Sequence, residues 1–254
     1  MNSWLLLQSG ACSSAFNMAL DEALLEASAH IGKPVLRFYG WNEPAATFGY
    51  SQRFANVERA TLLRPLIRRP TGGGVVPHDA DWTYSLTFPP DHEWHSLKAA
   101  ESYHRVHEWI RFAFAKLDVA TELAPCSKKS PETVCRSRCE EAHSEKFKSS
   151  QRLLTSSPTG QCFVGHVKFD LLWNGKKIAG AAQRRNKFGL LIQGSVQPPP
   201  ISLTRTGWEG AMCDVARQEL DVTWTGISPD VKLRARVDEL VRKKYSQETY
   251  NHKR

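Results

Sequence analysis

Three consecutive glycines at positions 72–74 restrict the fold of this chain more than any other feature. They stand in RRPTGGGVVPHDADWTYSL, residues 68–86, ahead of an alternating polar and apolar run that is typical of a β-strand. Glycine has no Cβ, so backbone N–H groups in such a run can approach a ligand closely or converge on an anion. The segment therefore predicts a loop between two strands that serves as a ligand cradle or as a flexible turn.

The residues beside the glycines narrow the chemistry of this loop. Arg68 and Arg69 favour a phosphate or a carboxylate as its ligand. The segment has neither the Lys-Ser/Thr pair of a P-loop nor the glycine spacing of a dinucleotide-binding motif. Neither of these nucleotide-binding folds is therefore implied.

The rest of the chain contains helical and strand patterns that do not strictly alternate. Residues 14–28 and 96–117 have apolar side chains at helical spacing, and Ser228-Pro229-Asp230 is a typical helix start. Strands are expected over residues 34–41, 45–52, 81–88, 167–174, 176–185 and 188–197. Asn174-Gly175 predicts a hairpin, and Asn42-Glu43-Pro44 predicts a turn between the first two strands. This order indicates an α+β fold with helices packed on a mostly antiparallel mixed sheet.

Length and composition suit one substantial domain with a small appendage, since 41% of the 254 residues are apolar. We expect a main domain over residues 1–200 and a helical extension over residues 201–254. Residues 124–160 are rich in Ser, Lys and Glu, which predicts a long polar loop or insertion. The start has no basic leader, and no run approaches the roughly 20 apolar residues of a membrane span. We therefore expect a cytoplasmic protein with no membrane partner.

The formal net charge of +8 suggests an acidic partner. The basic residues are spread along the chain and no groove-reading motif is visible, so nucleic acid is not the expected partner. A small acidic protein would use the same field, because charge complementarity mainly speeds encounter.

The six cysteines do not form an obvious disulfide or metal framework. Cys135, Cys139 and His143 would share one face of a helix, and Cys126 could complete a zinc site. Their spacing matches none of the usual zinc-binding pairs. A solvated loop is the favoured interpretation, and no metal is expected.

Four segments, in this order, resemble the lipoate–protein ligase A / octanoyltransferase family, which is related to biotin–protein ligase. They are NMALDEALL (17–25), LRFYGWNEPAATFGYSQ (36–52), the glycine segment (68–85) and NGKKIAGAAQRR (174–185). The resemblance implies the biotin/lipoate protein ligase catalytic-domain fold, with residues 36–52 forming its first hairpin. It also implies that the glycine loop wraps an acyl chain and its activated head group. The substrate-binding residues would be Arg69, Thr71, Gly72, Gly73, Gly74, His78, Gly180 and Ala181. For His78, a hydrogen-bonded loop histidine is the alternative.

The resemblance further implies a catalytic pair. The essential lysine of the family falls on Lys177, and Cys162 in GQCFVGH precedes it by fifteen positions, as in the cysteine-dependent LipM branch. That branch moves octanoate from acyl carrier protein, through a cysteine thioester, to a lysine of a lipoyl carrier such as the glycine cleavage H protein. No cofactor is then required. Phe169-Asp170 is the nearest equivalent of an aromatic–acidic pair in the family.

Other functions stay open at this point. An ATP-dependent lipoate ligase would use ATP and magnesium, Lys177 would contact the acyl-adenylate, and Cys162 would be incidental. An amidotransferase would move octanoyl groups between lipoyl domains, and a non-catalytic relative would only bind carriers. Without the family alignment, Cys162 is an ordinary half-buried strand cysteine and Lys177 a solvated strand lysine.

Overall fold

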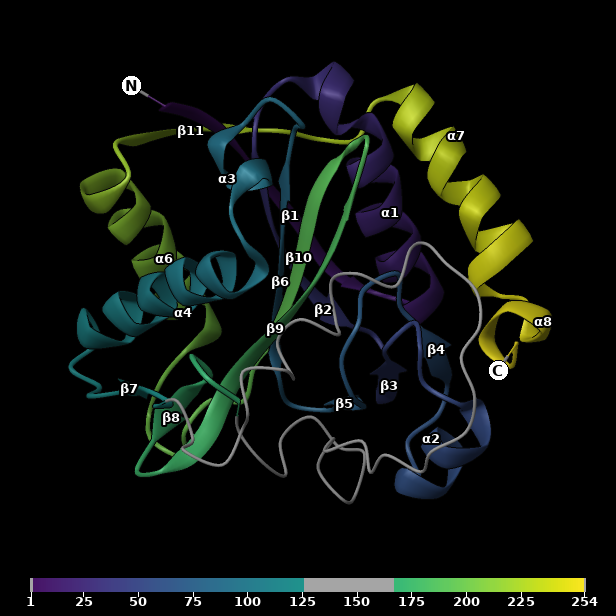
Figure 1. Cartoon of the computed structure of the whole chain (residues 1–254), viewed down its shortest axis with the longest axis horizontal. Coiled ribbons are helices and arrows are strands. Elements are labelled where there is room, and N and C mark those ends of the chain that lie inside the picture. The colour runs from purple at the N-terminus through teal and green to yellow at the C-terminus, as the bar shows by residue number, and fades with distance from the viewer. Residues whose placement is uncertain (1, 126–166, 254) are drawn as a thin grey trace, which may run out of the picture.

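The fold is built on two β-sheets, one of eight strands and one of three (Figure 1). The structure is a computed structural model, and it describes residues 2–125 and 167–253. In pairing order, the large sheet contains β11 (Val222–Gly226), β1 (Asn2–Cys12), β2 (Val35–Trp41), β6 (Trp82–Phe88), β10 (Gly189–Val196), β9 (Lys176–Asn186), β8 (Leu171–Trp173) and β7 (Glu122–Leu123). The small sheet contains β4 (Leu66–Arg68), β3 (Ala45–Phe48) and β5 (Val76–His78).

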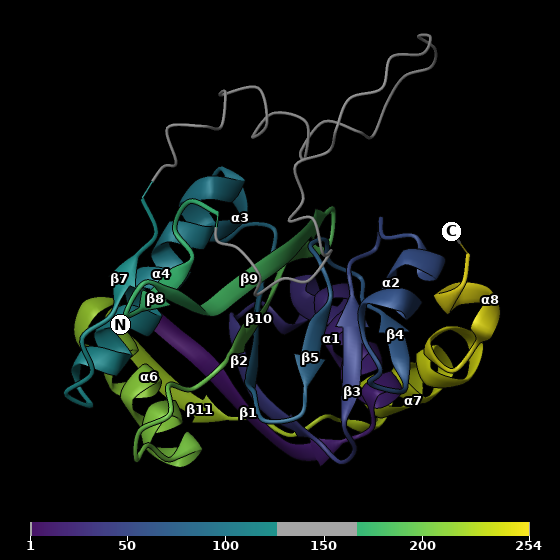
Figure 2. The same cartoon turned by 90° about the horizontal axis from the view of Figure 1, so that it is seen from below.

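Helices cover both faces of the large sheet. The helices of the described residues are α1 (Ser14–Ile31), α2 (Phe54–Ala60), α3 (Glu93–Ser96), α4 (Ala99–Ala115), α6 (Arg205–Glu219), α7 (Val231–Leu240), the π-helical turn η1 (Val241–Tyr245) and α8 (Glu248–Asn251), of which α2 and α8 lie against the small sheet. Helices α4 and α6 lie on one face, and α1 and α7 lie on the other (Figures 1 and 2). Leu36 and Phe38 of β2 pack with the first pair of helices, whereas Val35 and Tyr39 pack with the second. Alternate residues of a strand point to opposite faces, so β2 is buried on both sides.

The pairing confirms the predicted fold class. Strand β1 is parallel to both of its neighbours, β11 and β2, and every other pair in the large sheet is antiparallel. The predicted hairpin at Asn174-Gly175 joins β8 and β9, and both turn residues have positive φ, as a type I′ turn requires. Helix α1 begins where expected, because the Ser13 side chain accepts a hydrogen bond from the N–H of Phe16.

The predicted hairpin over residues 36–52 is wrong. Strand β2 pairs with β1 and β6, so both of its edges are already occupied. Strand β3 instead pairs with β4 and β5 and belongs to the small sheet. The turn at residues 42–44 therefore passes the chain from one sheet to the other.

The C-terminal residues are less uniformly helical than expected. They contain α6, α7 and α8, but β11 lies between α6 and α7 and extends the large sheet beside β1. The cap of α7 is Asp230, whose side chain accepts from the N–H of Leu233. The boundary proposed at residue 200 stays a prediction, and most of the predicted polar insertion, residues 126–160, lies outside the described residues. Within residues 2–125 and 167–253, no helix is long and apolar enough to cross a membrane.

Candidate functional site

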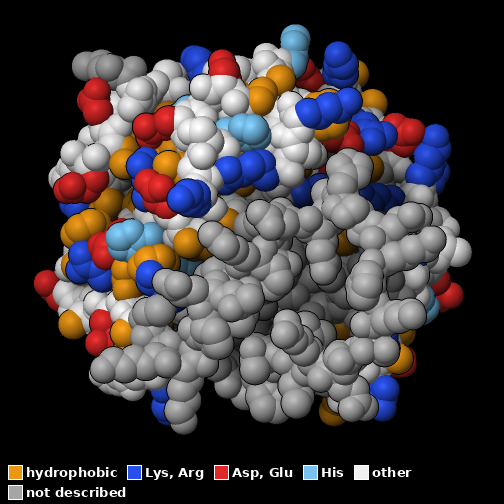
Figure 3. Space-filling model, viewed as in Figure 1, with side chains coloured by type: hydrophobic (Ala, Val, Ile, Leu, Met, Phe, Trp, Pro, Cys, Tyr) orange, Lys and Arg blue, Asp and Glu red, His pale blue; other side chains and the backbone are white. Residues whose placement is uncertain are grey.

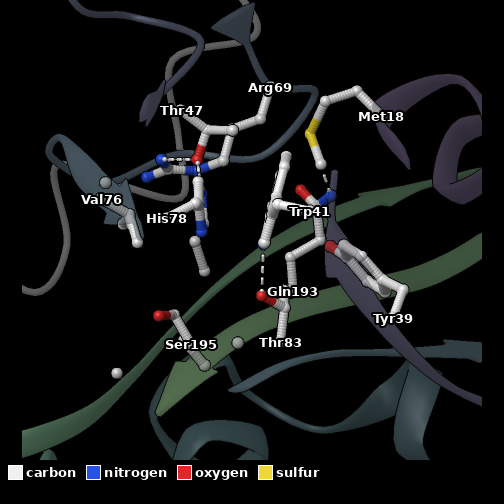
Figure 4. Close-up of a pocket in the computed structure, with 15 residues that line it drawn as sticks. Met18, Tyr39, Trp41, Thr47, Arg69, Val76, His78, Thr83, Gln193 and Ser195 are labelled. Carbon is white, nitrogen blue, oxygen red and sulfur yellow. Dashed lines mark hydrogen bonds between the residues drawn. The ribbon is translucent and has the colours of Figure 1, made fainter. Parts of the chain in front are cut away.

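A pocket lies between the glycine loop, the start of α1 and the strands of the large sheet (Figure 4). Five of the eight predicted substrate-binding residues line it: Arg69, Gly73, His78, Gly180 and Ala181. The sequence did not single out the other lining residues, which are Met18, Tyr39, Trp41, Thr47, Val76, Thr83, Ala182, Gln193, Gly194 and Ser195. Much of this lining is apolar, which suits a hydrocarbon chain.

The glycine loop is held closed by its own arginine. The Arg69 guanidinium donates to the carbonyl oxygens of Gly72, at 2.6 Å, and Gly74, at 2.8 Å. Gly73 has a φ of 92°, in the region that favours glycine. Gly49 is also required, because a Cβ there would lie 2.1 Å from the Gly73 carbonyl oxygen. Gly72 and Gly74 thus serve the pocket through their carbonyls and do not line it themselves.

Arg68 fixes the base of the loop to the C-terminus and does not line the pocket. Its guanidinium donates to the carbonyl oxygens of Tyr50, Gln52 and Asn251, and its backbone N–H donates to the Asn251 side chain. The expectation that Arg68 faces an anionic ligand is therefore wrong, because backbone carbonyls occupy its donors.

Thr71 reaches the pocket through Gln193. The Thr71 hydroxyl donates to Oε1 of Gln193 at 2.7 Å, and Nε2 of Gln193 donates to Asp21 at 2.7 Å. Asp21 forms a fully buried ion pair with Arg37, also at 2.7 Å, and accepts a hydrogen bond from Tyr39. Burial raises the pKa of Tyr39 well above its usual value, so its hydroxyl stays protonated. This network fixes the pocket floor to α1.

His78 lies at the end of β5, lines the pocket and is hydrogen-bonded through both ring nitrogens. Its Nε2 is 2.8 Å from Oγ1 of Thr47, and its Nδ1 is 2.9 Å from Oδ2 of Asp81. The ring stacks on Trp41 with centroids 3.8 Å apart. Oδ2 of Asp81 also accepts hydrogen bonds from Thr83 and Ser195. His78 is therefore a hydrogen-bonded histidine that also lines the pocket.

Lys177 is buried in an ion pair and is not a solvated lysine. Its Nζ lies 2.8 Å from Oδ2 of Asp170, and the two side chains are 6% and 5% exposed. A Cβ on Gly180 would lie 2.9 Å from this Nζ. Gly180 therefore provides the space that the ammonium occupies. A Cβ on Gly73 would in turn meet Ala182 at 3.7 Å. Gly180 and Ala182 share a face of β9, so the ammonium lies on the face toward the glycine loop.

The charges of Asp170 and Lys177 influence the pKa of the nearby His107 side chain. Burial lowers the pKa of His107 to about 4, and the nearby Asp170 carboxylate only partly opposes that shift. The ring is therefore neutral at pH 7. In the sequence, His107 occupies an ordinary core position of a helix, so no local pattern marks it as part of the site.

Several predicted residues lie outside the described residues. They are Cys162, the proposed nucleophile, and the possible metal ligands Cys126, Cys135, Cys139 and His143. Within the described ranges, no group of His, Cys, Asp or Glu is arranged to hold a metal ion.

Residues 13–197 match the family described as the lipoyl protein ligase A/B catalytic domain. The chain belongs to this family. The match contains the glycine loop, the Lys177 ion pair and every residue that lines the pocket. The resemblance predicted from four sequence segments is thereby confirmed.

Relatives of known name include octanoyltransferases LipM. The LipM of Geobacillus kaustophilus is 35% identical over 202 residues, which cover 76% of this chain and 64% of that protein. The LipM of Bacillus subtilis (strain 168) is 36% identical over 202 residues, with the same coverage. The chain thus spans 64% of the length of these relatives, which is less than two thirds.

Solved structures share the fold. A lipoate-protein ligase A bound with ATP superposes with a TM-score of 0.71 at 20% identity, covering 99% of both chains. A bi-partite lipoate protein ligase from Thermoplasma acidophilum gives a TM-score of 0.68 at 18% identity, covering 99% of this chain and 96% of that one. At these identities the likeness establishes the fold, which confirms the predicted catalytic-domain architecture.

Proposed function

We propose that the protein is an octanoyltransferase of protein lipoylation that works through a thioester on Cys162. The acyl group would come from octanoyl-acyl carrier protein and pass to a lysine of a lipoyl carrier domain. The main support is the match of about 35% identity to octanoyltransferases LipM, together with a buried lysine ammonium beside a largely apolar pocket.

The pocket supplies the two surfaces that such a substrate needs. Met18, Tyr39 and Val76 offer apolar contacts to a hydrocarbon chain, whose burial is favourable because it removes apolar surface from water. The exposed Gly73 places bare backbone at the same pocket, where an acyl carbonyl can approach closely. The thioester head group would then lie toward Gly180, next to the ammonium of Lys177.

Lys177 would stabilise negative charge in the transfer. An ammonium beside the thiol favours the thiolate, and it stabilises the oxyanion of a tetrahedral intermediate in a site that excludes water. Because Asp170 holds the ammonium at 2.8 Å, its position is set before the substrate arrives. A preorganised ammonium stabilises the developing negative charge more strongly than the ammonium of a mobile surface lysine would.

The position of Cys162 in the chain is compatible with this role. Cys162 precedes Val167 by five residues, and the N–H of Val167 donates to Oδ2 of Asp170, the oxygen that also holds Lys177. Five residues of extended chain span about 17 Å. The sequence spacing therefore permits the role that we propose for Cys162.

The proposed partners are small acidic proteins, namely the acyl donor and the lipoyl acceptor. The net charge of +8 would accelerate encounter with both. Figure 3 shows Lys and Arg side chains intermingled with Asp and Glu on the described part of one face. The attraction would therefore be spread over the surface, and we expect the rate to fall as ionic strength rises. No cofactor is required by this chemistry.

Intact mass analysis after incubation with octanoyl-acyl carrier protein tests the proposal. The wild-type protein should gain one octanoyl group that hydroxylamine removes, and Cys162→Ala should gain none. A matched Cys213→Ala variant should behave as wild type, because Cys213 lies on α6 with its side chain buried in the core. No adduct on the wild-type protein would refute the thioester route.

Two alternative functions are distinguished by the substrates they use and the products they release. An ATP-dependent ligase would release pyrophosphate from ATP, magnesium and lipoate, and Cys162→Ala would leave that reaction intact. An amidotransferase would take the acyl group from an octanoylated lipoyl domain and not from acyl carrier protein.

A further inference from the structure

A basic patch lies beside the glycine loop, in the region where α8 contacts β4 (Figures 1 and 2). It consists of Tyr50, Arg184, Tyr250 and Lys253, which come from three separate parts of the chain. The Lys253 ammonium lies 4.0 Å from the centroid of the Tyr50 ring and 4.4 Å from that of the Tyr250 ring. The guanidinium carbon of Arg184 lies 6.0 Å from the Tyr50 centroid. Both cations therefore face the same tyrosine ring.

The positive charge of the basic patch is not balanced within the part of the chain that the structure describes. Lys244 also lies over the Tyr250 ring, at 4.8 Å, but it is paired with Glu22 at 2.6 Å. Among the described residues, no Asp or Glu forms an ion pair with Arg184 or Lys253. These two cations are at most about 10 Å apart, which is about one Debye length at 0.1 M salt. An anionic partner would relieve their repulsion.

The basic patch continues directly from the pocket along β9. Gly180 and Arg184 point to the same face of this strand, because residues separated by an even number of positions share a face. Gly180 lines the pocket, and the Arg184 guanidinium lies 3.5 Å from the Pro70 carbonyl oxygen. The Tyr50 N–H donates to the carbonyl oxygen of Thr71 at 2.8 Å. A partner on the basic patch would therefore lie against the glycine loop.

The side chains of the basic patch suit a protein surface as the partner. Tyr and Arg are enriched in the centres of protein–protein interfaces. Tyr50, Arg184 and Tyr250 are partly buried, so their positions are restrained before a partner arrives, and Lys253 is exposed. Charge complementarity then requires that the facing surface be acidic.

The distance to the pocket favours one of the two acidic proteins in the proposed function. Arg184 lies four strand positions from Gly180, which corresponds to about 13 Å. In the proposed function the acyl head group lies toward Gly180, beside the Lys177 ammonium. The side chain of an acceptor lysine is much shorter than this distance, so a lipoyl domain has to contact the pocket itself. An acyl carrier protein presents its acyl group on a phosphopantetheine arm, which is several times longer than a lysine side chain.

We propose that the basic patch is the docking surface for the acyl carrier protein that donates the octanoyl group. This inference rests on the proposed function and identifies the surface that the donor uses. Acidic side chains of the carrier contact Arg184 and Lys253, and its arm follows β9 into the pocket. No covalent bond changes in this step.

Binding of acyl carrier protein, measured without acyl transfer, tests the proposal. The probe is the carrier with its phosphopantetheine arm but no acyl group, labelled for fluorescence anisotropy. We expect its Kd to rise about 2- to 5-fold in Lys253→Gln and in Arg184→Gln, and about 5- to 20-fold in the double variant. The Kd of wild type should also rise between about 0.05 and 0.3 M salt, and this dependence should be weaker in the double variant.

Arg217→Gln is the matched charge control. Arg217 lies on α6, on the other face of the large sheet, and is paired with Asp214 (Figure 2). This variant loses the same charge as Lys253→Gln, but its Kd for the carrier should stay close to that of wild type. The Kd for a lipoyl domain should also be unchanged in all of these variants.

Steady-state transfer gives a second measurement. The variants Arg184→Gln and Lys253→Gln should raise the KM for octanoyl-acyl carrier protein and leave kcat unchanged, because saturating carrier restores the complex. Lys253 contacts the two tyrosine rings and not the glycine loop, so an effect of Lys253→Gln reports docking. Arg184→Gln could also disturb the loop through Pro70, and a fall in kcat would reveal that.

Three results would overturn the proposal. The first is an unchanged Kd for the carrier in the double variant. The second is a loss of affinity for the lipoyl domain that equals or exceeds the loss for the carrier, which would assign the basic patch to the acceptor. The third is an effect of Arg184→Gln without any effect of Lys253→Gln, which would indicate a change in the glycine loop. Failure of the proposed function is recognised separately, because wild type would then gain no octanoyl group from the carrier.

Discussion

Gly180→Ala should impair transfer while leaving the protein folded. The new Cβ would lie 2.8 Å from Cε and 2.9 Å from Nζ of Lys177, whereas ordinary contacts of a Cβ begin at 3.4 Å. The ammonium must therefore withdraw by about half an ångström or more, which disturbs its 2.8 Å contact with Asp170. Displacement of a catalytic group by 1 Å can cost on the order of 100-fold in rate.

We expect octanoyl transfer to fall about 10- to 100-fold in Gly180→Ala. The free energy of unfolding should change by less than about 1 kcal/mol, because the clashing atoms end a flexible side chain and alanine restricts the unfolded chain. Single-turnover transfer monitored by intact mass and urea denaturation measure the two quantities.

Gly194→Ala is the same substitution on the neighbouring strand β10, and it serves as a control in which the added Cβ meets a rigid side chain. Its Cβ would lie 2.1 to 2.2 Å from the ring and hydroxyl of the fully buried Tyr84, which cannot move aside. This variant should lose about 1–3 kcal/mol or more of stability. A wild-type transfer rate in a folded Gly180→Ala protein would refute the role given to the Lys177 position.

Three further predictions concern buried ionisable groups. Asp170→Asn should slow transfer about 10- to 100-fold, because Lys177 loses its ionic partner; a single-turnover rate within twofold of wild type would contradict this. Arg37→Met should cost about 3–5 kcal/mol in urea denaturation, because Asp21 is left buried without its ion pair, and a loss below 1 kcal/mol would argue against the network. His107→Leu should flatten the pH dependence of stability. In wild type, the folded-state pKa of about 4 lies below the unfolded value of 6.5, so stability is present above pH 6.5 and falls by up to about 3 kcal/mol toward pH 4. Denaturation at pH 7 and pH 4.5 compares the two proteins, and equal slopes would remove His107 as the cause.

Short sequence motifs correctly predicted the start of a helix and a tight turn, because neighbouring residues determine both features. Ser13 caps α1 because its side chain replaces a missing backbone partner, and Asn174-Gly175 turns because both residues tolerate positive φ. The glycine run and the segment around Lys177 were located by their resemblance to the family. The structure places Gly73, Gly180 and Ala181 around one pocket.

Long-range pairing was not predictable from local patterns. Strand β2 pairs with β1 on one edge and with β6 on the other, and these strands are far apart in sequence. Because both edges of β2 are paired, it cannot form the expected hairpin with β3. The pocket floor was missed for a related reason. Asp21 lies in a helical pattern that suggests a solvent-facing acid, and its burial is made favourable by partners from distant segments, namely Arg37, Tyr39, Ser85 and Gln193.

The contact between Arg68 and Asn251 makes the far end of the chain a structural support of the glycine loop. Asn251 lies beyond residues 13–197, which match the family, yet its side chain and carbonyl receive the backbone and guanidinium donors of Arg68. Deletion of the final helix would leave these buried donors without acceptors, one residue before the arginine that closes the loop. The hydrogen bonds between Asn251 and Arg68 thus connect α8 to the base of the glycine loop.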